Sequence, residues 1–103
     1  MPSLEGITDR VRQAVGDESG LDARIKFNFG EEGWLFIDGK SVPNQVHNTD
    51  QESDITIAVS LANFERIIDG QLNPKVALMT GRMRLRGDIR IAMRLDKVFG
   101  LAS

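Results

Sequence analysis

Residues 70–95 constrain the fold more than any other part of the chain, because several structural signals follow one another in this short segment. Gly70 ends one helical pattern and Asn73-Pro74 begins another, since asparagine caps a helix and proline fits its first position. In residues 82–86, arginines alternate with methionine and leucine, which is typical of a strand with one apolar face. Asp88 then opens a final helix. Because the segment holds no motif of an activated nucleophile or a metal site, it favours the enclosure of an apolar group over catalysis.

The final helix is more apolar than a surface helix needs to be. At 100° per residue, Arg90, Arg94 and Lys97 fall within an arc of about 60°. Apolar side chains cover most of the remaining circumference: Ile89, Ile91, Ala92, Met93, Leu95, Val98 and Phe99. Since a surface helix needs an apolar stripe only somewhat wider than about 100°, another element, a partner chain or a ligand must cover the excess. The alternative is that the helix simply packs between the sheet and the first helix.

The periodicity of the whole chain predicts a single α+β domain over residues 1–103. The chain is expected to begin with a helix over residues 4–15, followed by four strands over residues 23–29, 34–37, 41–46 and 55–59. A helix over residues 61–69 and another from residue 74 then lead to a fifth strand over residues 82–86 and a final helix from residue 88 onward. Pro43 places the weak strand 41–46 at a sheet edge, because proline removes a donor from the ladder.

The residue inventory argues against an enzyme. The chain contains no cysteine, and His47 is its only histidine. A cysteine nucleophile, a thiolate zinc site and a disulfide framework are therefore excluded. No P-loop, dinucleotide fingerprint or nucleophile elbow occurs. We accordingly expect no catalytic residue, no metal and no cofactor.

Charge is distributed unevenly along the chain. Residues 1–70 carry six basic and thirteen acidic side chains, whereas residues 71–103 carry seven basic and two acidic ones. One end of the molecule therefore faces something anionic, or two oppositely charged faces attract each other within the fold. A nucleic-acid partner is not expected, because the net charge is −2 and no aromatic residue interleaves with Arg82, Arg84 and Arg86.

The spacing of residues after position 70 resembles that of the sterol carrier protein type 2 family, the non-specific lipid-transfer domains. The matching residues are Gly70-Gln71-Leu72-Asn73-Pro74, Ala77, Gly81, Met83, Leu85, Gly87-Asp88 and Ala92-Met93-Arg94-Leu95. The resemblance covers about residues 20–96 and is sharpest from Gly70 onward. It implies a mixed, mainly antiparallel five-stranded sheet, with helices on one face that enclose an apolar cavity. It also implies non-covalent binding of a fatty acid, fatty acyl-CoA, isoprenoid or sterol-like lipid.

The resemblance also implies which side chains line the cavity. Those expected from the sheet are Phe27, Phe29, Trp34, Phe36, Ile57, Val59, Met83 and Leu85. Those expected from the helices are Phe64, Ile67, Ile68, Ala77, Leu78, Ile89, Ala92 and Met93. Arg82, Arg84 and Arg86 are expected to contact an anionic membrane transiently or to bind the phosphates of a CoA headgroup.

The chain ends in Leu101-Ala102-Ser103 and not in the Ser-Lys-Leu tripeptide that many eukaryotic members carry. We therefore expect a cytoplasmic, bacterial protein. We also expect it to be a monomer or a weak dimer. The alternative function is an accessory module, in which the same apolar surface binds a partner protein of a lipid- or quinone-pathway enzyme complex. A continuous exposed patch without a cavity favours this alternative, whereas an enclosed apolar volume favours a ligand.

Overall fold

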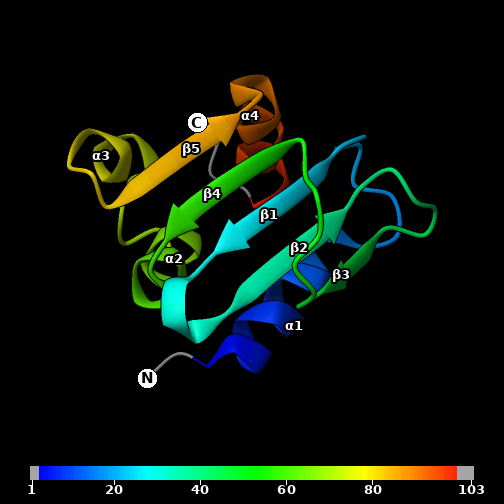
Figure 1. Cartoon of the computed structure of the whole chain (residues 1–103), viewed down its shortest axis with the longest axis horizontal. Helices are drawn as coiled ribbons and strands as arrows, with labels where there is room; N and C mark the ends of the chain where they lie inside the picture. The colour runs from blue at the N-terminus through cyan, green and yellow to red at the C-terminus, as the bar shows by residue number, and fades with distance from the viewer. Residues whose placement is uncertain (1–2, 100–103) are drawn as a thin grey trace.

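The computed structural model describes residues 3–99, which form one five-stranded sheet and four α-helices (Figure 1). The elements are α1 (Leu4–Val15), β1 (Arg24–Asn28), a 3₁₀ turn (Gly30–Glu32), β2 (Trp34–Asp38), β3 (Gln45–His47), β4 (Ile55–Val59), α2 (Leu61–Ile68), α3 (Pro74–Met79), β5 (Met83–Gly87) and α4 (Ile89–Val98). This order confirms the α+β class and the predicted succession of helices and strands. The C-terminal Leu101-Ala102-Ser103 lies outside the described residues.

The sheet has the strand order β3-β2-β1-β4-β5. β1 and β4 are parallel and the other neighbouring strands are antiparallel, so the predicted mixed, mainly antiparallel sheet is confirmed. β3 and β5 are the two edge strands. The segment from β4 to β5 contains α2 and α3, so these two helices lie beside the strands that they connect (Figure 1).

The edge strand β3 is shorter than predicted and begins only after Pro43. Asp38 accepts hydrogen bonds from the backbone N–H of Lys40 and Ser41, and its second oxygen accepts one from the Ser41 hydroxyl. The Asn44 amide donates to the Ser41 carbonyl at 2.7 Å. These local bonds fold the predicted start of the strand into a turn, because Asp, Ser and Asn side chains compete with ladder hydrogen bonds.

The helices cover one face of the sheet, with α1 and α4 behind it in Figure 1. The buried apolar core lies between these helices and the sheet, and includes Val11, Ile25, Leu35, Ile37 and Leu61. Residues 48–54 cross the opposite face, where Lys26 Nζ lies 2.8 Å from Asp50 Oδ1. Within residues 3–99, no helix combines the length and apolarity needed to cross a bilayer.

Three side-chain caps fix where the helices on the β4–β5 side begin. Ser60 Oγ accepts from Asn63 N at α2, Asn73 Oδ1 accepts from Lys75 N at α3, and Asp88 Oδ1 accepts from Arg90 N at α4. Each cap satisfies a backbone donor that a helix start leaves without an intrahelical partner. The predicted helix starts at Ser60, Asn73 and Asp88 are therefore confirmed.

Candidate functional site

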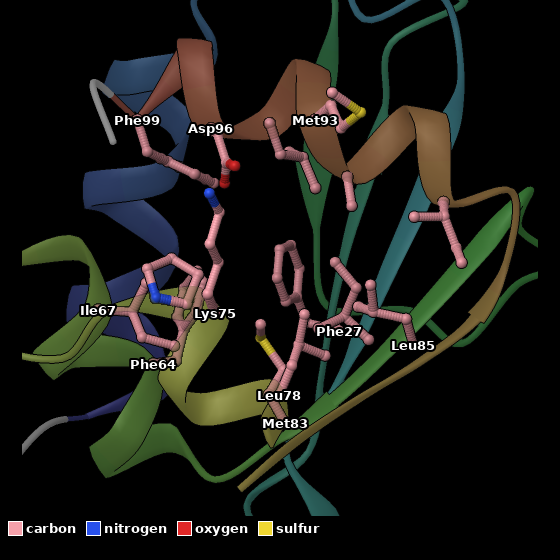
Figure 2. A pocket seen from close by; sticks show the side chains of 15 residues that line it. Phe27, Phe64, Ile67, Lys75, Leu78, Met83, Leu85, Met93, Asp96 and Phe99 are labelled. Atoms are coloured by element: carbon pink, nitrogen blue, oxygen red, sulfur yellow. The ribbon is translucent and has the colours of Figure 1, made fainter. Parts of the chain in front are cut away.

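A pocket of about 200 Å³ lies between the sheet and helices α2, α3 and α4 (Figure 2). Its lining residues are Phe27, Ile57, Phe64, Ile67, Pro74, Lys75, Leu78, Met83, Leu85, Ile89, Ala92, Met93, Leu95, Asp96 and Phe99. All of them except Lys75 and Asp96 are apolar. A wall of this composition suits an apolar ligand, because transfer of apolar surface out of water is favourable.

Most of the side chains expected at the cavity do line this pocket. They are Phe27, Ile57, Phe64, Ile67, Leu78, Met83, Leu85, Ile89, Ala92 and Met93. Met83 and Leu85 face inward because the side chains of a strand alternate between its two faces. The others come from the apolar stripes of three helices and from the helix-covered face of β1 and β4.

Trp34 and Phe36 lie on the opposite face of the sheet and do not line the pocket. Leu35 and Ile37, which alternate with them along β2, belong to the core on the helix-covered face. Phe36 is fully buried, and its ring stacks on that of His47 in the neighbouring strand β3, with a centroid distance of 5.0 Å. Every position from 34 to 37 is apolar, so the sequence alone did not reveal which alternate set faces the helices.

Four further candidates pack beside the pocket without lining it. Phe29 and Val59 are buried in the core, and the Phe29 ring lies 5.5 Å from the Phe64 ring, centroid to centroid. Ala77 is fully buried, and the half-buried Ile68 packs against the same core. The Phe29 ring therefore supports the part of the pocket wall that Phe64 forms.

Five further residues line the pocket and were not among those predicted from the sequence: Pro74, Lys75, Leu95, Asp96 and Phe99. Their spacing did carry a signal. Asp96 follows Ala92 by four positions, so both lie on the same stripe of α4, and Phe99, the C-cap residue three positions later, continues that stripe. The charge of Asp96 interrupted the apolar pattern, and it therefore fell outside the expected set.

The pocket is open to solvent along α4, where part of its lining is exposed. Ile89 and Met93, which line it from α4, are 63% and 67% exposed. Met79 at the end of α3 is 86% exposed. Part of the apolar surface of α4 is therefore left uncovered by residues 3–99. The predicted alternative, simple packing of this helix between the sheet and the first helix, does not account for that exposed surface.

The charged side chains have different roles around this site. Burial raises the pKa of Asp96, and the nearby Lys75 opposes this shift. Arg94 is held by its 2.8 Å hydrogen bond to the Leu21 carbonyl, and Arg90 pairs with Asp88. Within the described part of the chain, no group of three or more His, Asp or Glu side chains forms a metal-binding cluster.

Arg82, Arg84 and Arg86 are all exposed. Within β5, Arg84 and Arg86 alternate with the two residues that line the pocket, so they extend from the other face of the edge strand. The basic stripe and the apolar pocket mouth therefore adjoin the same strand but lie on its two sides.

Comparison with known proteins supports the function class that this geometry indicates. A family model described as the SCP-2 sterol transfer family matches residues 8–100. The chain belongs to this family. Members of this family have lipid binding and transfer as their general function.

Among curated proteins, hydroxysteroid dehydrogenase-like protein 2 of Rattus norvegicus is 27% identical to the chain over 95 residues. The alignment covers 85% of this chain and 18% of that protein, so the chain spans less than a fifth of the length of this SCP-2 relative.

Two solved structures share the fold. Sterol carrier protein 2 of Yarrowia lipolytica, in its apo form, has a TM-score of 0.76 at 22% identity, covering 94% of this chain and 89% of its own. Palmitated SCP2L2 of Aedes aegypti has a TM-score of 0.68 at 23% identity, covering 95% of both chains. These similarities confirm the sheet and helix arrangement expected for an SCP-2 domain.

Proposed function

We propose that this chain carries a single-chain lipid, such as a fatty acid, a fatty acyl group or an isoprenoid, in the pocket between the sheet and α2–α4, without covalent chemistry. The observation that carries the proposal is the apolar lining of that pocket, which opens between exposed apolar side chains of α3 and α4. The palmitated state of the SCP2L2 protein of Aedes aegypti supports this ligand class. The carrier function does not require a catalytic residue.

The size of the pocket favours a ligand that is only partly enclosed. Its volume of about 200 Å³ is below the roughly 300–1,000 Å³ of typical small-molecule sites. Met83 and Met93 line opposite walls, and the unbranched thioether side chain adapts to ligands of different shape. We therefore expect these methionines to move apart when a lipid chain enters.

Filling the pocket tests the proposal. Ala92 lines the pocket from α4, whereas Ala62 is an exposed residue of α2 outside it. Ala92→Phe is expected to abolish lipid binding, while the matched substitution Ala62→Phe leaves it intact. Native mass spectrometry, with organic extraction of the released molecule, measures the stoichiometry. Equal lipid occupancy in both variants would place the ligand elsewhere, and no binding in the unmodified chain would refute carriage.

We further propose that the β5 edge contacts anionic membranes while the ligand is exchanged. Exposed Ile89 and Met93 line the pocket from α4, and the exposed Arg84 and Arg86 extend from the other side of β5, the strand whose Met83 and Leu85 line it. A basic residue near an anionic bilayer contributes about 1 kcal/mol. Replacing Arg82, Arg84 and Arg86 together with glutamine is expected to weaken association with phosphatidylserine vesicles roughly 100-fold. Lipid capacity should stay unchanged, and an equal loss of both properties would contradict the proposal.

The exposed apolar residues also support a second candidate function, a protein-interaction module. Met79 and Met93 present apolar surface that a partner protein or a second copy of the chain would cover. Sedimentation of the lipid-free chain separates the two functions. A monomer that takes up lipid supports the carrier, whereas a stable dimer that takes up none supports the interaction module.

A further inference from the structure

Two charged side chains lie at one end of the otherwise apolar pocket. Lys75 extends from α3 and Asp96 from α4, and the ammonium and carboxylate groups point toward each other across the pocket (Figure 2). Lys75 is exposed and Asp96 is half-buried, so the cost in free energy of burying a charge falls on the carboxylate, and a wall that served only for an apolar chain would have no need of that group.

The two groups are near each other without being bonded. Among residues 3–99, the ion pairs do not include Lys75 with Asp96, and neither side chain has a hydrogen-bond partner. Their electrostatic interaction is nevertheless present, since Lys75 opposes the increase in pKa that burial imposes on Asp96. Asp96 is half-buried, so water solvates its carboxylate only in part. A hydrogen-bond donor placed between the two groups would supply this carboxylate with a hydrogen bond.

The chemistry of the pair defines what fits between its members. A lysine ammonium only donates hydrogen bonds and a carboxylate only accepts them. A hydroxyl does both, so it accepts from Lys75 and donates to Asp96. A ligand carboxylate accepts from Lys75 but places a second negative charge beside that of Asp96, and neighbouring like charges repel each other.

We propose that Lys75 and Asp96 form a headgroup subsite that selects lipids with an uncharged hydroxyl head over the matching carboxylates. Lys75 anchors both kinds of head, and Asp96 discriminates between them. This proposal rests on the carrier function proposed above, because it assigns the ligand class of the same pocket.

Three ligands of equal chain length test the selection: 1-hexadecanol, hexadecanoate and hexadecane. Each is radiolabelled, delivered from methyl-β-cyclodextrin at pH 7.5, and its partition to the protein is measured. We expect about tenfold tighter binding of the alcohol than of the carboxylate, a factor that corresponds to about 1.4 kcal/mol. Lys75→Met should weaken binding of both headed ligands and leave hexadecane unchanged.

The variant Asp96→Asn isolates the discriminating group. It should raise carboxylate affinity and reduce the preference for the alcohol to about threefold or less. Asp88→Asn is the matched control, because Asp88 lies at the start of the same helix outside the pocket and asparagine also caps helices. Equal binding of alcohol and carboxylate by the unmodified chain would overturn the selection. An unchanged preference in Asp96→Asn would overturn the role of Asp96. If none of the three ligands binds, the carrier function itself fails.

Discussion

Gly87, which pairs with Ile55 of the neighbouring strand β4, has no room for a side chain, and an alanine there is expected to destabilise the protein strongly. Gly87 has a φ of +121°, a conformation that L residues rarely adopt. A Cβ at this position would lie 2.9 Å from Ile55 Cα and would also collide with the Asp54 carbonyl oxygen. Both neighbours are backbone atoms of the adjoining segment, so no side-chain rotation relieves the contact.

The expected loss of stability is the sum of the cost of backbone strain and the cost of the steric overlap. Backbone strain of this kind costs about 1–3 kcal/mol, and overpacking against fixed atoms costs about 1–3 kcal/mol more. The sum of about 2–6 kcal/mol corresponds to a decrease in Tm of at least roughly 8 °C, at about 4–8 °C per kcal/mol for a domain of this size. Because Gly87 lies between the pocket residues Leu85 and Ile89, lipid binding should also weaken.

Gly70→Ala provides the matched control. Gly70 also has a positive φ, of +77°, but no other side chain or backbone segment lies within 4 Å of the position that an alanine methyl group would occupy. Its substitution should cost only the left-handed strain of about 1–2 kcal/mol. Thermal unfolding followed by circular dichroism, with urea unfolding as a second measurement, compares the two variants. A Gly87→Ala protein as stable as Gly70→Ala would refute the steric argument.

Three further predictions concern stability. Phe64 is buried with its ring 4.7 Å from that of Phe27, centroid to centroid, so Phe64→Ala should cost about 3–5 kcal/mol in urea unfolding; a loss below about 1 kcal/mol would contradict this. Burial raises the pKa of Asp96, so ionisation of this carboxyl reduces stability as pH rises from its unfolded pKa near 4 through its higher folded pKa. Asp96→Asn should therefore raise Tm at pH 7 but not at pH 3. An unchanged Tm at pH 7 would contradict this prediction. Hydrogen bonds from Arg90 lower the pKa of Asp88, so the stabilisation by ionised Asp88 is present above about pH 4 and is lost as pH falls through the folded pKa. Asp88→Asn should therefore flatten the decrease in Tm below about pH 4. An equally steep decrease in the variant would show that Asp88 does not contribute to the acid sensitivity.

The sequence alone determined most of the secondary structure, because the signals involved are local. The helix starts at Ser60, Asn73 and Asp88 depend on hydrogen bonds that span two or three residues. The periodicity of β1, β4 and β5 depends on neighbours two positions apart. Where local chemistry supported two outcomes, the prediction was less accurate, as at the turn that replaces the first half of the strand expected over residues 41–46.

The tertiary structure decided which of two possible faces each apolar set occupies. Trp34 and Phe36 are as apolar as Leu35 and Ile37, and only the pairing of β2 within the sheet turns the second pair toward the helices. The sequence also contains no relation between Lys75 and Asp96, which come from two helices separated by β5. Their approach depends on the packing of α3 and α4 on either side of the pocket, and packing is a non-local property that local periodicity does not encode.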